Sequence, residues 1–157
     1  MKAEATNTII FLDFDGALFP RRFSILNNGA DPVLVLLLNN FGQNGAKIVA
    51  CSSARSSEGG KDFCANTMCE AGINRLYLHE EVITNPALPR WDSIKDFLCR
   101  HPQFTDVIIF DDDAPSVELL RYFHESDLYY IYPRIDEDCG LEYNQILQLT
   151  CHASYPQ

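Results

Sequence analysis

Two aspartates stand one residue apart at the end of an apolar run, in the stretch Phe-Leu-Asp-Phe-Asp-Gly that covers residues 11–16. Side chains alternate along extended backbone, so we expect Asp13 and Asp15 to project to one side where a buried strand ends. Two carboxylates this close raise each other's proton affinity unless a cation or a shared proton lies between them. Mg²⁺ suits this position, because it takes hard oxygen ligands and is usually held by one or two carboxylates with water and substrate phosphate. The alternative for so short a motif in an acidic chain is a solvated turn.

A second acidic cluster, residues 111–113, follows another apolar run at residues 107–110. The strands of a parallel sheet end at a common edge, and ligands bind outside those carboxyl ends. If the two apolar runs form neighbouring parallel strands, the two acidic clusters meet. The second cluster therefore favours a functional role for the first.

Two adjacent serines, Ser52 and Ser53, follow a third apolar run. A hydroxyl and free backbone N–H groups at a strand end can hold phosphate oxygens without adding charge. An ordinary helix N-cap is the alternative for this segment.

A cation is also expected near these groups, because phosphate and several carboxylates would otherwise crowd one pocket. The candidates are Arg90 and Lys95, which lie before and within the helix expected ahead of the second acidic cluster. The alternative for each of them is a surface position.

Composition limits the possible functions of the chain. Its 157 residues, 46% of them hydrophobic, predict a single domain over residues 1–157 with a substantial core. Twelve basic against 22 acidic residues give a net charge of −10, which argues against a surface that follows nucleic-acid backbones. The six cysteines lack the paired spacing of a zinc site. The N-terminal residues lack the pattern of a signal peptide, and the longest apolar run is too short to span a bilayer, so we expect a cytoplasmic protein without membrane contact.

Strand-like and helix-like patterns alternate along the chain. An Asp-Pro pair at residues 31–32 supplies an N-cap and a first-turn proline for the first helix. Short apolar strands without polar alternation, separated by helices, indicate an α/β fold with a parallel sheet covered on both faces. We expect strands at residues 8–12, 46–51, 73–78, 106–110 and 128–132, and helices at residues 33–41, 61–70, 91–100, 115–124 and 141–151.

Taken in order, these motifs resemble the haloacid dehalogenase-like (HAD) superfamily of phosphohydrolases. Its members carry an Asp-x-Asp signature, then Ser or Thr, then Lys, then an acidic motif. The resemblance covers nearly the whole chain, and residues 90–113 are most similar to small capless members found in bacterial RNA-repair proteins. It implies a three-layer Rossmann-like fold with five parallel strands in the order 5-4-1-2-3.

The resemblance also implies roles for individual residues in a magnesium-dependent phosphatase. Asp13 would be the nucleophile that forms an aspartyl phosphate, and Asp15 the general acid and base. Ser53 would bind phosphate, with Ser52 as the alternative. Mg²⁺ would be held by the Asp-x-Asp carboxylates and by Asp112, with Asp111 beside it.

The residue that stands for the family's lysine is Arg90, if the helix is aligned on Ile94 and Leu98. Arginine keeps the charge and can bind phosphate through two donors, but it is bulkier and cannot reproduce the point contact of a lysine. Lys95 is the other candidate for this role. The alternative to an active phosphatase is therefore a catalytically weak or inactive HAD-like module that binds or regulates.

The spacing of the motifs bears on the substrate. The chain between Asp13 and Ser53, and between Ser53 and Arg90, is already filled by the expected loops, helices and strand, so no cap domain is expected. An open site excludes water poorly and binds a small ester weakly, so binding energy must come from contacts outside the pocket. We therefore expect a phosphorylated macromolecule as substrate, and a protein rather than a nucleic acid because of the net charge.

Overall fold

Five short strands form one parallel sheet in the order β3-β2-β1-β4-β5. The computed structural model describes residues 7–23, 29–142, 144–146 and 149. The strands are β1 (Thr8–Leu12), β2 (Lys47–Ala50), β3 (Leu78–Ile83), β4 (Asp106–Phe110) and β5 (Tyr129–Ile131). This is the predicted order 5-4-1-2-3 read from the other edge, so the predicted topology is confirmed.

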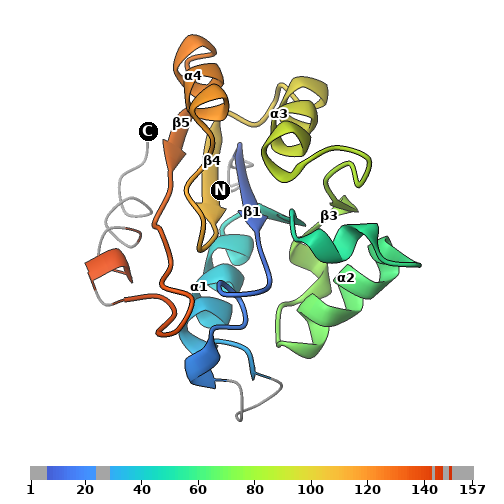
Figure 1. Ribbon diagram of the computed structural model, residues 1–157, viewed down its shortest axis with the longest axis vertical. Helices are drawn as coiled ribbons and strands as arrows, with labels where there is room; N and C mark the ends of the chain where they lie inside the picture. Colours follow the sequence, from blue (N-terminus) through green and yellow to red (C-terminus); the bar gives the residue numbers. More distant parts are fainter. Residues whose placement is uncertain (1–6, 24–28, 143, 147–148, 150–157) are drawn as a thin grey trace, which may run out of the picture.

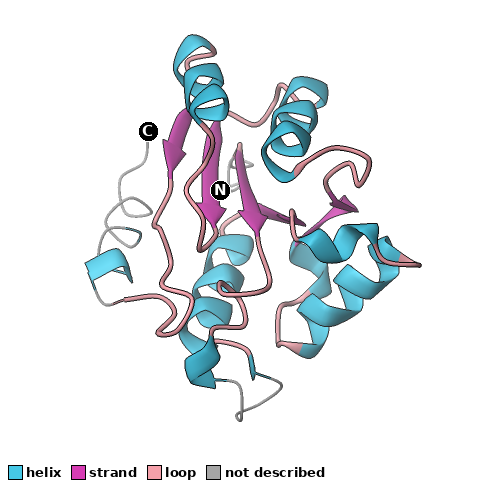
Figure 2. Cartoon of the chain, in the orientation of Figure 1, coloured by secondary structure: helices cyan, strands magenta, loops and turns pink. Residues whose placement is uncertain are grey.

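Helices cover both faces of the sheet and make three layers (Figures 1 and 2). On one face lie α1 (Pro32–Gln43) and α2 (Gly60–Glu70), and on the other α3 (Arg90–Arg100) and α4 (Val117–Glu125). Short 3-10 turns within the described residues include η1 (Arg21–Phe23), η3 (Ser53–Ser56) and η4 (Arg75–Tyr77). The predicted three-layer α/β architecture is confirmed.

The central strand β1 is buried on both sides. Ile10 and Leu12 pack against α1 and α2, whereas Ile9 and Phe11 pack against α3 and α4. All four side chains are fully buried. Burial on both faces explains why this segment shows no alternation of polar and apolar residues.

Helix α1 begins as its sequence predicts. The Asp31 carboxylate accepts hydrogen bonds from the backbone N–H groups of Val33 at 3.0 Å and Leu34 at 3.4 Å. Pro32 occupies the first turn, where its missing N–H would have had no partner within the helix. This cap fixes the chain just after the loop that leaves the end of β1.

The third strand lies later than predicted, so this prediction was wrong. It was expected at residues 73–78, but those residues include Asn74, whose side chain caps the η4 turn, and the strand begins at Leu78. The segment Leu-His-Glu-Glu-Val-Ile lacked a strand signal because β3 is an edge strand, where polar side chains reach solvent. An irregularity in its pairing with β2 coincides with Val82, whose φ is 64°.

The remaining elements match their predicted positions to within one or two residues at most ends. The helix expected at residues 141–151 falls partly outside the described residues. Within that range, the described residues 144–146 and 149 are helical. None of the helices built from the described residues has the length and apolar character needed to cross a bilayer.

Gly42 in α1 offers a test of the packing between α1 and η4. A Cβ at this position would lie 2.2 Å from Cγ of Tyr77 and 2.4 Å from its Cδ2. Overpacking of this kind costs about 1–3 kcal/mol and outweighs the gain of about 1 kcal/mol in helix propensity. We therefore expect Gly42→Ala to lower the free energy of unfolding, measured by urea denaturation. The exposed neighbour is the control: Gln43→Ala should unfold near the wild-type midpoint, and equal stability of both variants would contradict the contact.

Candidate active site

The register of the central strands brings the two acidic clusters together. Leu12 of β1 lies opposite Phe110 of β4, and the Asp13 N–H donates to the Phe110 carbonyl at 2.9 Å. The next residues, Asp13 and Asp111, therefore stand side by side at the carboxyl edge of the sheet. Carboxylate oxygens of Asp13, Asp111 and Asp112 all lie within 4.8 Å of one another.

Asp15 does not belong to this group of three. Its side chain is exposed, in a tight turn where the Ala17 N–H donates to the Phe14 carbonyl and the Leu18 N–H to the Asp13 carbonyl. Of the four predicted metal ligands, three thus converge and Asp15 stands at the open rim. This position suits contact with solvent and with a substrate more than coordination through its carboxylate.

Gly16 lets the turn pack directly on the second acidic cluster. Its φ is +80°, and an added Cβ would lie 2.5 Å from Oδ2 of Asp112 and 2.7 Å from its Cγ. Only glycine fits both the left-handed backbone and this contact. The backbone of the first motif therefore forms one wall around the Asp112 carboxylate.

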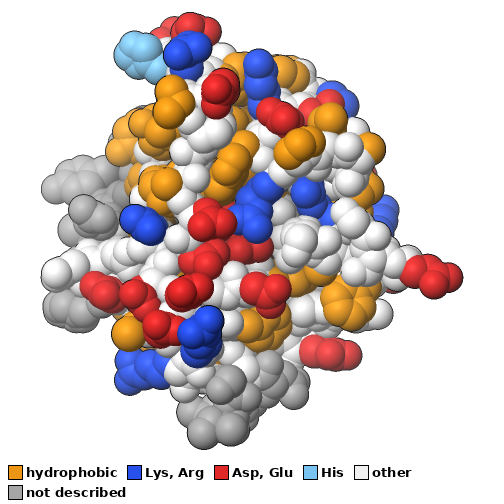
Figure 3. Space-filling view, in the orientation of Figure 1, with side chains coloured by type: hydrophobic (Ala, Val, Ile, Leu, Met, Phe, Trp, Pro, Cys, Tyr) orange, Lys and Arg blue, Asp and Glu red, His pale blue; other side chains and the backbone are white. Residues whose placement is uncertain are grey.

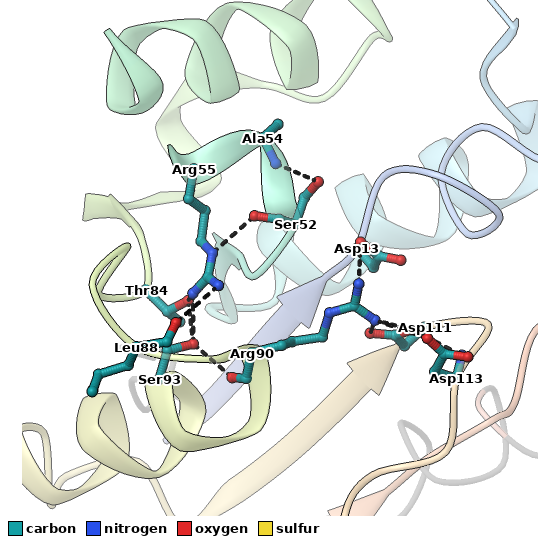
Figure 4. A network of polar contacts seen from close by, with 10 residues as sticks. All are labelled: Asp13, Ser52, Ala54, Arg55, Thr84, Leu88, Arg90, Ser93, Asp111 and Asp113. Atoms are coloured by element: carbon teal, nitrogen blue, oxygen red, sulfur yellow. Dashed lines mark hydrogen bonds and ion pairs between the residues drawn. The ribbon is translucent and has the colours of Figure 1, made fainter. Parts of the chain in front are cut away.

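Arg90 lies among the carboxylates at the first residue of α3 (Figure 4). Its Nη1 is 2.9 Å from both carboxylate oxygens of Asp111 and 3.4 Å from Oδ2 of Asp113. Its Nη2 is 3.7 Å from Oδ1 of Asp13. One guanidinium thus faces three carboxylates and offsets part of their charge.

Lys95 points elsewhere. It follows Arg90 by five residues on a helix with 3.6 residues per turn, so it lies on a different side of α3. The residue is exposed, and its Nζ lies 5.5 Å from the ring centroid of Tyr122. The structure therefore does not bring the second candidate cation to the carboxylates.

The two serines stand at the end of β2, next to the end of β1. The Cys51 N–H donates to the Leu12 carbonyl at 3.0 Å and so extends the pairing of these strands. Ser52 is buried, and its Oγ accepts from the Ala54 N–H at 3.2 Å, which makes it the N-cap of η3. Ser53 is exposed and has no such bond among the described contacts.

Arg55 was not among the residues predicted to belong to the site. Its side chain is buried and bonds to the Ser52 carbonyl and to the hydroxyls of Thr84 and Ser93 (Figure 4). An arginine in a polar stretch ordinarily indicates an exposed side chain. The available signal was its position three residues after Ser52, in a segment that already carried two candidate groups.

A second group of metal-ligand types gathers at the other end of α3. His79, Glu81 and His101 have ligand atoms within 4.8 Å of one another. Several of their polar atoms are already engaged: His79 Nδ1 accepts from the Glu81 N–H at 3.1 Å, and the Glu81 carboxylate binds Arg100 and His101. This cluster links β3 to the end of α3 and is separate from the carboxylates around Arg90.

The carboxylate site favours a cation. Burial raises the pKa of Asp13 from 3.8 to about 8, with a further rise from Asp111 and a partial offset by Arg90. Burial likewise raises the pKa of Asp111. Burial lowers the pKa of Arg90, but the nearby carboxylates of Asp13 and Asp111 outweigh this effect, so the pKa of Arg90 is raised above its ordinary value. Hard oxygen donors, excess negative charge and the Gly16 wall fit Mg²⁺, which Asp13 and Asp112 could hold because Asp111 is already paired with Arg90.

One family of known proteins matches the chain. The family model of the HAD domain in Swiss Army Knife RNA repair proteins matches residues 9–142. The chain belongs to this family. The matched region runs from the second residue of β1 past the end of β5 and contains all of the carboxylates described above, so the chain is a small capless HAD-like domain of hydrolase type. No curated protein and no solved structure matches the chain significantly.

Gly16→Ala should weaken Mg²⁺ binding in this HAD domain, because the new Cβ would displace the Asp112 carboxylate. Disturbing the groups that orient a metal ligand typically lowers affinity on the order of 10- to 100-fold. Titration calorimetry with MgCl₂ measures the change. Gly59→Ala is the control, since Gly59 also has a positive φ, +66°, but nothing lies within 4 Å of an added Cβ. Equal affinities of the two variants would contradict the contact with Asp112.

Asp13→Asn should stabilise the metal-free protein at alkaline pH. Because the pKa of Asp13 is raised on folding, its contribution to stability is present below its unfolded pKa of about 4 and lost as the pH rises through about 8. Asparagine has a similar shape and no charge to bury. In the presence of a chelator, the variant should melt above wild type at pH 8, and the difference should narrow toward pH 5. A lower melting temperature of the variant at pH 8 would show that the buried Asp13 carboxylate does not destabilise the folded protein.

Proposed function

We propose that this HAD domain is a magnesium-dependent phosphohydrolase that acts through an aspartyl phosphate on Asp13. The observation that carries the proposal is the convergence of three carboxylates and one guanidinium at the carboxyl ends of β1 and β4. Membership of a HAD family supports the reaction class. The residue roles rest on this geometry and on the motif pattern of the superfamily.

In the first step, a carboxylate oxygen of Asp13 attacks the phosphorus of a monoester in line with the leaving oxygen. The bond between phosphorus and the leaving oxygen breaks, and Asp15 gives that oxygen a proton. The exposed position of Asp15 at the rim suits this role, because the leaving group departs toward solvent.

In the second step, a water molecule attacks the phosphorus of the aspartyl phosphate and gives a proton to Asp15. The bond between phosphorus and the Asp13 oxygen breaks, which releases inorganic phosphate and restores both carboxyl groups. Asp15 thus acts first as an acid and then as a base.

Charge compensation supports both steps. The Arg90 guanidinium donates to phosphoryl oxygens, and the Ser53 hydroxyl and nearby backbone N–H groups add neutral donors. When bound by Asp13 and Asp112, Mg²⁺ supplies Lewis-acid stabilisation of the phosphoryl charge. Arg90 reaches the site from the start of α3, so the rigid helix fixes its position.

A second candidate function follows from the partners of Arg90. Its guanidinium is engaged by Asp111, Asp113 and Asp13, and a phosphate must share it with them. A domain in which these pairs persist would bind Mg²⁺ and phosphate with little turnover. Such a HAD-like module would bind or regulate rather than hydrolyse.

The surroundings of the site support a macromolecular substrate. A cleft of about 490 Å³ adjoins the second acidic cluster, and acidic side chains gather over the carboxyl ends of β1 and β4 (Figure 3). The cleft is lined by Asp112, Asp113, Arg134, Ile135, Asp136, Glu137, Glu142 and Gln145. A surface of this charge repels polyanions and attracts basic segments. We therefore propose a phosphorylated protein as substrate; the family description makes a phosphorylated RNA end the second candidate.

A panel of substrates tests the function and the substrate class together. Phosphopeptides, 3′- and 5′-phosphorylated oligonucleotides and small phosphate esters are compared with Mg²⁺ and with a chelator. We expect magnesium-dependent release of phosphate, with the highest kcat/KM on phosphopeptides. Hydrolysis that is equally fast in the presence of the chelator, or no hydrolysis at all, would contradict the proposed magnesium-dependent phosphohydrolase activity. A preference for one small ester would contradict the macromolecular substrate, and a preference for oligonucleotides would favour RNA.

Measurements of kcat/KM distinguish the two candidate cations, Arg90 and Lys95. Arg90→Ala should lower kcat/KM on the order of 100-fold, because it removes the charged donor next to Asp13. Lys95→Ala is the matched control on the same helix and should keep a rate near that of wild type. The reverse ranking would transfer the role to Lys95.

A further inference from the structure

A buried arginine, Arg55, connects the two segments that would bind phosphate, namely the turn after β2 and the start of α3. Arg55 is 6% exposed. Its Nε donates to the Ser52 carbonyl at 2.8 Å, and its Nη1 to Thr84 Oγ1 at 2.5 Å and Ser93 Oγ at 2.6 Å. Longer bonds run from Nη1 to the Asn85 carbonyl at 3.3 Å and from Nη2 to the Leu88 carbonyl at 3.4 Å.

All of these acceptors are neutral. Within the described ranges of the chain, no carboxylate forms an ion pair with Arg55. Burying a charge without an acidic partner is costly, and an apolar side chain would fill the same space without that cost. What an apolar side chain cannot supply is a rigid fork of donors that holds several acceptors at once. The acceptors belong to three separate segments: the end of β2, the loop after β3, and α3.

The contacts lead to Arg90 by two routes. The Ser93 hydroxyl, which accepts from Arg55, donates to the Arg90 carbonyl at 2.6 Å. The Leu88 carbonyl, which also accepts from Arg55, lies two residues before Arg90. Pro89, the N-cap of α3, makes no side-chain capping bond, and the contacts of Arg55 and Ser93 reach backbone carbonyls on either side of it. Arg55 thus holds the backbone on both sides of the point where the Arg90 side chain leaves it.

We propose that Arg55 is a positioning residue that fixes the distance between the turn at Ser52 and Ser53 and the Arg90 guanidinium. This inference rests on the proposed function, in which both groups bind the same phosphoryl group. Arg55 itself touches none of the reacting atoms described above. Its task is to keep two phosphate-binding elements in register although they come from different strands and helices.

The variant Arg55→Lys distinguishes positioning by the guanidinium from the effect of its positive charge. Lysine keeps the positive charge but loses the planar fork, so it cannot hold Ser52, Thr84 and Ser93 together. Small misplacements of catalytic groups cost up to about 100-fold in rate, so we expect kcat to fall on the order of 10- to 100-fold. KM should change less, because the lost alignment matters most in the transition state.

A double-mutant cycle shows whether Arg55 acts through Arg90. If it does, Arg55→Lys should lower kcat less in the Arg90→Ala background than in wild type. Equal losses in both backgrounds would overturn the coupling. Leu98→Ala is the stability control: it removes a buried side chain of α3 outside the network and lowers the melting temperature. A loss of kcat in Leu98→Ala as large as in Arg55→Lys would reduce the role of Arg55 to general stability.

A measurement that does not depend on turnover separates the test of the positioning role from the test of phosphohydrolase activity. In ¹⁵N NMR of arginine side chains, Arg55→Lys should shift the Arg90 Nε signal and leave the Arg100 signal unchanged. An unchanged Arg90 signal would overturn the positioning role even if the enzyme is active. A shifted signal without activity in wild type would support the positioning role and contradict the proposed reaction.

Ser93→Ala covers the case in which Arg55→Lys does not fold. It removes one hydroxyl and cuts the link to the Arg90 carbonyl, while Arg55 keeps its other acceptors. The same shift of the Arg90 signal is expected, with a smaller loss of kcat. Wild-type values for both readouts would overturn the proposal.

Discussion

The pairing of β1 with β4 is the constraint on which the site depends. With Leu12 opposite Phe110, the first residue beyond each strand is an aspartate, and both carboxylates emerge at one point of the sheet edge. Their burial and mutual repulsion oppose folding of the metal-free protein. This cost in folding free energy explains the other features of the site. Helix α3 brings the Arg90 guanidinium to the carboxylates, the Gly16 turn packs against Asp112, and the site suits a divalent cation.

The chain meets this electrostatic demand with parts from distant segments. The carboxylates come from two strands, the guanidinium from α3, and the neutral donors from the turn after β2. Helix α3 joins these parts because it carries Arg90 in its first turn and packs its apolar side on the sheet with Ile94, Phe97 and Leu98. A displacement of this helix would therefore change the charge balance of the site as well as the packing of the core.

The apolar strands and the acids at their ends predicted a parallel α/β sheet and, for neighbouring strands, the meeting of the acidic clusters, whereas the order of the strands came from the resemblance to the HAD superfamily. It failed at β3, where an edge strand tolerates the polar pair Glu80 and Glu81 and so lacks the apolar signal. The choice between Arg90 and Lys95 needed the orientation of the helix, which a linear pattern with two nearby cations does not determine. Arg55 was missed because its partners lie 29 and 38 residues further along the chain.

The contact between Gly16 and Asp112 changes how the short acidic motif is read. Because the glycine leaves space for a carboxylate nearly a hundred residues away, Asp-x-Asp-Gly and the acid after β4 form one discontinuous unit. Either half alone is common and uninformative in an acidic protein. A pattern that requires both, separated by the strands and helices that bring them together, describes a three-dimensional feature in linear form. It would separate chains that can build this wall around a cation from those that merely contain a solvated acidic turn.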